Sequence, residues 1–128
     1  MPANSIPTRT GMICVDTHGI VHVRFNPGAE ETLADAQACV SSVLSLFDGE
    51  TRPLLVDMRL LKSLERDARN YYGSPEVMCH TTALALLVGS RVSTVIANFF
   101  LSVTKSSVPT RLFTDEAQAI EWLKGFPA

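Results

Sequence analysis

The sequence predicts an α/β domain built on a mixed, mostly parallel β-sheet with helices packed on it. Residues 54–58 and 83–88 form two continuous apolar runs, which are typical of central strands covered on both faces. Between residues 33 and 47 apolar side chains recur with a helical period, and further helical segments separate the later strands. Alternating strands and helices favour parallel strands joined by right-handed crossovers. The expected order is strand, strand, helix and then three strand–helix units.

A hairpin and a long helix are expected first. Residues 12–16 are the first predicted strand, and residues 20–25 alternate apolar and polar side chains as a second strand does. Gly19, between them, tolerates the positive φ of a tight turn. Glu30 and Glu31 then place negative charge where a helix dipole favours it. The helix that follows is predicted from one apolar stripe, made of Leu33, Ala36, Val40, Val43, Leu44 and Phe47.

Three strand–helix units complete the predicted chain. Helices are expected at residues 65–72, at a short stretch restarting at Ser74 and Pro75, at residues 91–105 and from Asp115 onward. The expected inner stripe of the 91–105 helix is Val92, Val95, Ile96, Phe99 and Val103. Phe100 and Leu101 widen its apolar surface, so this helix either packs deep in the monomer or contributes to a dimer interface. A homodimer through this helix or an exposed strand edge is the corresponding prediction.

Length and composition describe a single domain. The 128 residues fit one unit, with residues 1–11 as a flexible N-terminal tail and residues 12–126 as the domain. The formal net charge of −2 argues against a general electrostatic hold on nucleic acid. Charged residues make up 19% of the chain, below the usual ~25%, which leaves apolar surface for a partner.

The sequence also indicates a compartment. Three scattered cysteines form neither a disulfide framework nor a CxxC metal site, and they fit a reducing cytosol. Residues 1–11 lack the apolar segment of a signal peptide. The longest apolar stretch, residues 95–103, falls short of the ~20 residues that a membrane span needs. A cytoplasmic protein without a membrane span is expected.

The middle of the chain resembles a known family. STAS domains (sulfate transporter and anti-sigma factor antagonist, the SpoIIAA-like family) have a hydrophobic strand ending in Asp-Leu, a short loop and an Asp-Ser-Ser-Gly stretch that opens a helix. Here Leu55-Val56-Asp57-Met58 is similar to the strand end, residues 59–64 to the loop, and Glu65-Arg66-Asp67-Ala68 to the helix opening. The resemblance runs from about residue 12 to residue 126. It implies a non-enzymatic protein-interaction module with a regulatory role in bacteria.

The resemblance also implies a switch that this sequence has changed. Regulators of the family are controlled by phosphorylation of a serine in the helix opening, and Asp67 stands at the matching position. Because residues 65–67 carry no hydroxyl group, we predict that phosphorylation does not control this stretch. Ser63 is the alternative acceptor if the register differs by a few residues. A second alternative is a small-ligand or lipid-binding domain related to the CRAL-TRIO fold, which would need a concave apolar cavity of ~300 Å³ or more.

Six residues around the 65–72 helix are candidates for an interaction or anion-binding surface. They are Arg59, Lys62, Ser63, Arg66, Asp67 and Arg69. They follow a central strand and lie near a helix N-terminus, where α/β sheets bind ligands and backbone N–H groups attract anions. The alternative is a solvated helix face on which Glu65 and Asp67 neutralise part of the positive charge.

The sequence assigns no catalytic residue, metal or cofactor. His18, His22 and His80 have no nearby carboxylate cluster with which to form a zinc site, and the adjacent Cys79 and His80 point apart on a helix. Asp57 closes a central strand, where its expected role is to accept hydrogen bonds from the following loop. The expected partner is another protein or a second copy of the chain, with a small molecule or lipid as the alternative ligand.

Overall fold

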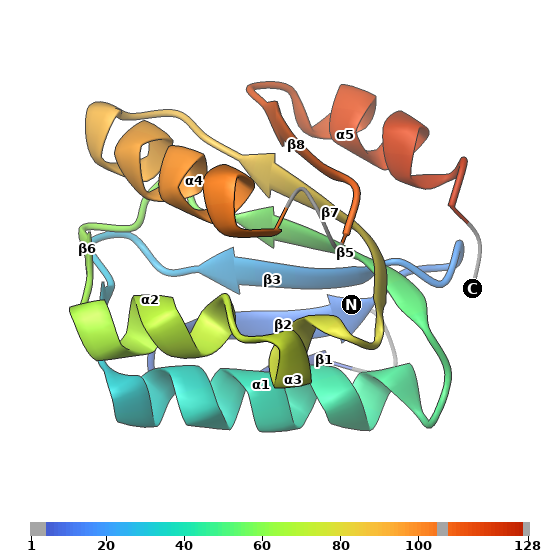
Figure 1. Ribbon diagram of the computed structural model, residues 1–128, viewed down its shortest axis with the longest axis horizontal. Coiled ribbons are helices and arrows are strands. Elements are labelled where there is room, and N and C mark those ends of the chain that lie inside the picture. Colours follow the sequence, from blue (N-terminus) through green and yellow to red (C-terminus); the bar gives the residue numbers. More distant parts are fainter. Residues whose placement is uncertain (1–4, 105–107, 127–128) are drawn as a thin grey trace.

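A six-stranded sheet forms the centre of the computed structural model, which describes residues 5–104 and 108–126, without the side chains of residues 76, 103 and 104 (Figure 1). The strands in their order across the sheet are β1 (Ser5–Pro7), β2 (Gly11–Val15), β3 (Val21–Phe25), β5 (Arg52–Asp57), β7 (Thr81–Leu87) and β8 (Thr110–Phe113). The first three strands pair antiparallel, and β3, β5, β7 and β8 pair parallel. The mixed, mostly parallel sheet predicted from the sequence is confirmed.

Helices cover the two faces of the sheet unequally. They are α1 (Leu33–Phe47), α2 (Arg66–Tyr72), α3 (Pro75–Met78), α4 (Arg91–Thr104) and α5 (Glu116–Leu123). Residues of α1, α3 and α4 share one buried cluster with the sheet, and α5 forms a second cluster on the other face. The crossovers between parallel strands therefore lie on one face, and the C-terminal helix covers the other. Within the described ranges, no helix is long and apolar enough to span a membrane.

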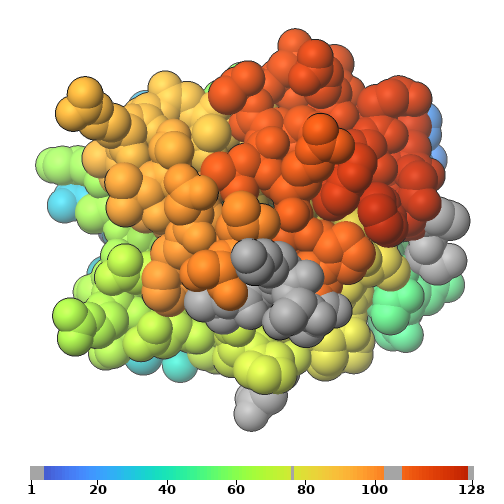
Figure 2. All heavy atoms as spheres, turned by 45° about the horizontal axis from the view of Figure 1, so that its top comes forward, coloured from blue at the N-terminus to red at the C-terminus, as the bar shows by residue number. Residues whose placement is uncertain are grey.

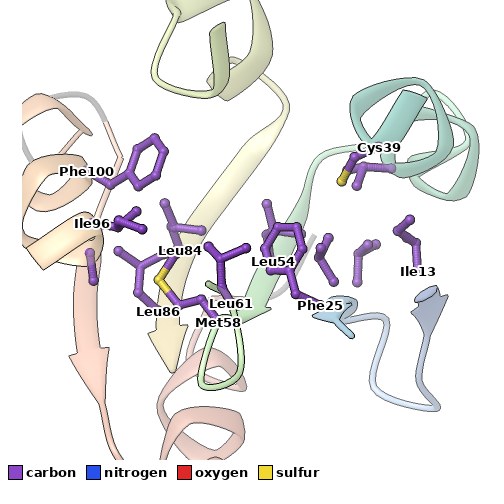
Figure 3. Packing of buried hydrophobic residues seen from close by; sticks show 14 of the residues in the cluster. Ile13, Phe25, Cys39, Leu54, Met58, Leu61, Leu84, Leu86, Ile96 and Phe100 are labelled. Atoms are coloured by element: carbon purple, nitrogen blue, oxygen red, sulfur yellow. The ribbon is translucent and has the colours of Figure 1, made fainter. Parts of the chain in front are cut away.

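The core depends on the alternation of side chains along β5 and β7. Leu54 and Leu84 point to the large cluster, whereas their neighbours Leu55 and Ala85 point to the α5 cluster. Figure 3 shows the large cluster as a row of side chains between the sheet and the helices. Because both faces are covered, these strands need apolar residues at every position, which produces the two apolar runs in the sequence.

The phase of α4 differs from the prediction. Ile96 and Phe100 are buried, but Val92 is 45% and Val95 66% exposed. The inward position one turn before Ile96 belongs instead to Ser93, whose hydroxyl accepts the N–H groups of residues 89 and 90 at 3.1 and 3.0 Å. A polar residue can face the core here because the turn that precedes the helix satisfies its hydroxyl.

Two short features were absent from the sequence prediction. Ser5–Pro7, placed in the N-terminal tail by the sequence, pairs with β2 as an edge strand. β4 (Glu30–Glu31) and β6 (Ser63–Leu64) form a separate parallel pair that joins the segment before α1 to the segment before α2. Strands of two or three residues are too short to show a period, so only pairing reveals them.

Candidate functional site

The carboxyl ends of the parallel strands gather the elements from which a site can be built. In Figure 1 the arrowheads of β3, β5 and β7 lie on the left, together with the first turns of α1, α2 and α4. Loops at this edge of an α/β sheet carry most of the binding residues in proteins of this class. The side chains here form three groups. They are an ionic cluster at the C-terminal end of β5, an exposed surface between α2 and α4, and a buried carboxylate just before α1.

The ionic cluster is centred on Asp57, the last residue of β5. Its carboxylate accepts hydrogen bonds from the backbone N–H of Arg59 at 3.2 Å and from Nε and Nη2 of the same arginine at 3.0 and 2.8 Å. Arg24 Nε approaches the carboxylate at 3.4 Å, and Glu116 of α5 pairs with Arg24 at 2.8 Å and Arg59 at 3.3 Å. Two arginines and two carboxylates therefore neutralise one another.

Electrostatics at Asp57 favour the ionised carboxylate. Burial alone would raise its pKa, but hydrogen bonds from the side chain and backbone of Arg59, together with the charges of Arg59 and Arg24, lower it. The expected role of Asp57 as an acceptor for the following loop is confirmed. Arg59, one of the six candidate residues, pairs with the carboxylates of Asp57 and Glu116. It therefore links the end of β5 to α5.

The other five candidates lie along β6 and α2. Lys62 is exposed just before β6, and Ser63 is exposed in β6. Arg66 and Asp67 are exposed in the first turn of α2. Arg69 is half-buried, with its guanidinium carbon 5.0 Å from the centre of the Phe99 ring in α4. Among the ion pairs of the described residues, none involves these five, so the local neutralisation by Glu65 and Asp67 is not seen in the structure.

Apolar side chains on α4 continue from the contact with Arg69. Phe99 packs against the guanidinium of Arg69, and Val95 and Val92 lie one and two turns earlier on the same side of the helix. We call these four residues the α2–α4 surface. In Figure 2 the start of α4 (gold to orange) is open at the surface beside α2 (green). Leu60, 57% exposed, follows Arg59, which contacts the β7–α4 loop at Gly89.

The buried carboxylate belongs to Glu31 of β4, which is 1% exposed. It accepts a hydrogen bond from the Thr10 hydroxyl at 2.5 Å and another from the Tyr72 hydroxyl of α2. Burial raises the pKa of Glu31 despite these two hydrogen bonds. Burial also raises the pKa of the neighbouring Cys39 thiol to about 12. From the sequence, Glu31 is expected only to complement a helix dipole, because no local pattern identifies a carboxylate whose partners are 21 and 41 residues away.

A cysteine, a histidine and an aspartate come together on the β2–β3 hairpin. Cys14 stands opposite His22 across the two strands, and His22 Nε2 lies 2.8 Å from Asp16 Oδ2. These are the residue types of a nucleophile, a base and an orienting group. However, burial raises the pKa of Cys14, which disfavours the reactive thiolate. The sequence carried a signal for this group, since residues 14 and 22 occupy matching positions of a predicted hairpin.

An apolar cavity of about 60 Å³ lies between the sheet and the helices. Its lining includes Cys39, Leu54, Tyr72, Met78, Leu84 and Phe100. Pockets that enclose small molecules are commonly ~300–1,000 Å³. The cavity is therefore far smaller than the lipid-binding alternative requires.

Two solved structures are similar to this chain. A solved structure from Shewanella loihica PV-4, an uncharacterized DUF3478 family protein with a SpoIIAA-like fold, is 14% identical over 93% of this chain and 90% of its own, with a TM-score of 0.63. A protein of unknown function from Arthrobacter sp. FB24 is 34% identical over 92% of this chain and 95% of its own, with a TM-score of 0.36. No curated protein matches the sequence.

The first comparison supports the fold alone, and it confirms the SpoIIAA-like architecture expected from the resemblance. A family model, the domain of unknown function DUF7793, matches residues 13–127. The match includes all five described helices and the whole sheet except β1 and the first two residues of β2, Gly11 and Met12. The chain therefore belongs to the DUF7793 family and has a SpoIIAA-like fold.

Proposed function

We propose that this protein is a non-enzymatic interaction module that binds another protein through the α2–α4 surface. The observation that carries the proposal is the exposure of Val92 and Val95, 45% and 66%, in line with Phe99 on one side of a helix. Contiguous exposed apolar side chains mark binding surfaces in soluble proteins. Arg69, stacked on Phe99, adds a residue type enriched at protein interfaces.

Charged groups of α2 and β6 border this surface and give it selectivity. Arg66 and Asp67 are exposed in the first turn of α2, with Lys62 and Ser63 just before it. A partner that presents apolar side chains flanked by a carboxylate fits this arrangement, because a surface arginine guides and orients the encounter more than it adds affinity. Arg59 supports the same edge indirectly by fixing the loop that carries Leu60.

The binding is constitutive in this proposal. Asp67 provides a permanent negative charge at the position where the resemblance places a phosphorylated serine, in the first turn of a helix. Ser63, the nearest hydroxyl group, belongs to β6 rather than to the helix. A regulatory role in bacteria completes the proposal, and the resemblance to anti-sigma factor antagonists supports it.

Three further observations support a cytoplasmic, non-enzymatic protein. Cys14 lacks the lowered pKa of a catalytic thiol. The carboxylate of Asp57 is occupied by Arg59 and Arg24. Cys14 and Cys39 are in no disulfide, which fits a reducing compartment. The lipid-binding alternative has less support, because the apolar cavity measures only about 60 Å³.

Comparative affinity capture tests the docking surface. The bait proteins are the wild type, Val95→Asp, which places a charge in the exposed apolar stripe, and Ala117→Asp, an exposed position on α5 across the sheet. We expect one protein to be recovered with the wild type and Ala117→Asp and to be reduced at least about tenfold with Val95→Asp. The purified pair should then show the same loss of affinity. Equal recovery of every bound protein by all three baits, with the fold intact by circular dichroism, would overturn the proposal.

Intact-mass analysis tests the constitutive character. Protein purified from its own cells under several growth conditions is expected to carry no phosphate on the peptide spanning residues 59–69. The positive control is an Asp67→Ser variant, which restores a hydroxyl group at the position implied by the resemblance. A phosphate group mapped to Ser63 of the wild type would replace constitutive binding with a switch.

A further inference from the structure

Arg69 carries a buried donor for which the described part of the chain supplies no acceptor. Its Nε is buried and makes no hydrogen bond, although the residue as a whole is half-buried. Glu65 lies one turn earlier, at the spacing of a helical ion pair, but among the described residues no ion pair joins the two. A donor buried in this way costs free energy. Because buried donors nearly always have acceptors, this one indicates an acceptor brought by another molecule.

The guanidinium is nevertheless held in a defined place. Its central carbon lies 5.0 Å from the centre of the Phe99 ring, the stacked arrangement that arginine favours on aromatic side chains. The Phe99 ring in turn makes an edge contact with the buried ring of Phe100, with 5.6 Å between the centres. Stacking uses the flat face of a guanidinium, whereas its N–H groups bind acceptors in the plane. Arg69 is therefore preorganised, so that binding an acceptor costs little side-chain entropy.

The surroundings of Arg69 match a singly charged acceptor beside apolar groups. Residues 62–69 contain three basic and two acidic side chains, which leaves a net charge of +1. This charge balances a carboxylate better than a phosphate group with its charge of about −2. Val95, 66% exposed and one turn before Phe99, adds an apolar neighbour. A carboxylate also matches the planar guanidinium, because it can accept two parallel hydrogen bonds.

We propose that Arg69 determines the specificity of the α2–α4 surface by binding the carboxylate of a glutamate or aspartate that the partner carries between apolar residues. This inference rests on the proposed docking function and adds the group that the partner must present. The apolar residues on either side of the carboxylate cover Val95 and Phe99 and exclude water. Exclusion of water strengthens the pairing of the carboxylate with the guanidinium.

Arg66 provides a matched comparison on the same helix. It is exposed in the first turn of α2, and among the described ring contacts it stacks on no aromatic side chain. A charge at the rim of an interface mainly changes the association rate, whereas loss of one member of a desolvated pair raises the dissociation rate. The two arginines, although equal in charge, are therefore expected to govern different rate constants.

Selection from a displayed library of short random peptides tests the proposal on the full chain. The baits are the wild type and Val95→Asp, and peptides that bind only the wild type are kept. We expect these peptides to share an acidic residue between apolar residues. Replacing this residue with its amide should weaken binding to the wild type at least about tenfold and binding to Arg69→Gln less than about twofold. Arg66→Gln should retain the tenfold loss.

Binding kinetics of the same peptides separate the two arginines. Arg69→Gln is expected to raise the dissociation rate constant at least about tenfold, and Arg66→Gln to lower mainly the association rate constant, less so at high salt. Peptides that depend on Val95 but contain no acidic residue, or bind Arg69→Gln as tightly as the wild type, overturn this inference and leave the docking surface standing. If no selected peptide depends on Val95, the docking surface fails, and this inference fails with it.

A stability measurement distinguishes binding from a structural role of Arg69. Arg69→Met keeps a long side chain against Phe99 and removes the buried N–H that lacks an acceptor. Its urea midpoint is expected to equal or exceed that of the wild type, with the same circular dichroism spectrum. A midpoint clearly below that of the wild type would show that the guanidinium stabilises the fold itself, and it would overturn the proposal.

Discussion

The hydroxyl of Tyr72 in α2 donates a hydrogen bond to the fully buried carboxylate of Glu31 in β4. This bond joins two segments that are 41 residues apart, and the pairing of β4 with β6 runs beside it. Because burial of a carboxylate costs free energy unless it is well hydrogen-bonded, the position of α2 and the ionisation of Glu31 depend on each other. The buried hydrogen bond between Tyr72 and Glu31 thus helps to fix the position of α2 and of its charged first turn.

Glu31→Gln is expected to remove a pH dependence of stability. Burial raises the pKa of Glu31 above its ordinary value of 4.5, so the folded state binds the proton more tightly than the unfolded state does. Its contribution is fully present below pH 4.5 and is lost as the pH rises through the folded-state pKa. Glutamine stays neutral, so urea titrations should show the wild type losing free energy of unfolding relative to Glu31→Gln between pH 4.5 and pH 7.

The comparison isolates Glu31 because its charged neighbours, Arg9 and Asp35, are present in both proteins. The hydrogen bond and charge of Arg9 lower the pKa of Asp35, so Asp35 titrates at more acidic pH and changes both curves alike. A constant difference between the two proteins from pH 4.5 to pH 7 would contradict the prediction.

Tyr72→Phe is expected to lower the free energy of unfolding at neutral pH by about 1–3 kcal/mol, because a buried oxygen of Glu31 loses its donor. In the Glu31→Gln background the same change should cost less, and a double-mutant cycle measures the difference. Tyr71→Phe, on the same helix, is the matched control and should stay within about 0.5 kcal/mol of the wild type. Equal effects of the two tyrosine changes would show that the hydroxyl of Tyr72 does not support Glu31.

Asp57→Asn is expected to destabilise the fold by about 1–3 kcal/mol, because Arg59 and Arg24 lose a charged acceptor at the end of β5. The pKa of Asp57 is lowered, so its contribution is present above the ordinary value of 3.8 and is lost as the pH falls through the folded-state pKa. The difference from the wild type in thermal and urea unfolding should therefore shrink in acid. Glu121→Gln, at an exposed ion pair with Lys124, should change stability by less than about 0.5 kcal/mol.

Leu86→Asp is expected to prevent folding, since Leu86 is 2% exposed in the central strand β7 and a carboxylate there has no partner. Leu86→Ala should fold with a loss of about 2–5 kcal/mol, through lost burial and the cavity left behind. Leu60→Ala, at an exposed leucine in the β5–β6 loop, should cost less than about 0.5 kcal/mol. A folded, soluble Leu86→Asp protein, judged by circular dichroism and gel filtration, would contradict the assignment of β7 to the core.

The sequence alone determined the order of the main elements and the identity of the central strands. Burial on both faces requires apolar residues at every position, and a helix packed on a sheet requires a stripe with a period of 3.6, so β5, β7 and α1 are readable from short windows. Local chemistry also indicated the start of α3, where Ser74 precedes Pro75. It placed Asp57 at the end of a strand and gave it the role of an acceptor.

Tertiary structure decided everything that depends on residues distant in sequence. The ionic cluster joins Arg24 to Glu116 across 92 residues, and no local window contains both partners. Ser93 set the phase of α4 against the apolar periodicity, because the hydrogen bonds that let it face the core come from the preceding turn. Glu31, expected as a negative charge at the start of a helix, is buried and accepts hydrogen bonds from Thr10 and Tyr72. The pattern of apolar residues shows how much of a helix or strand is buried. Which residues pack against it is determined only when the chain has folded.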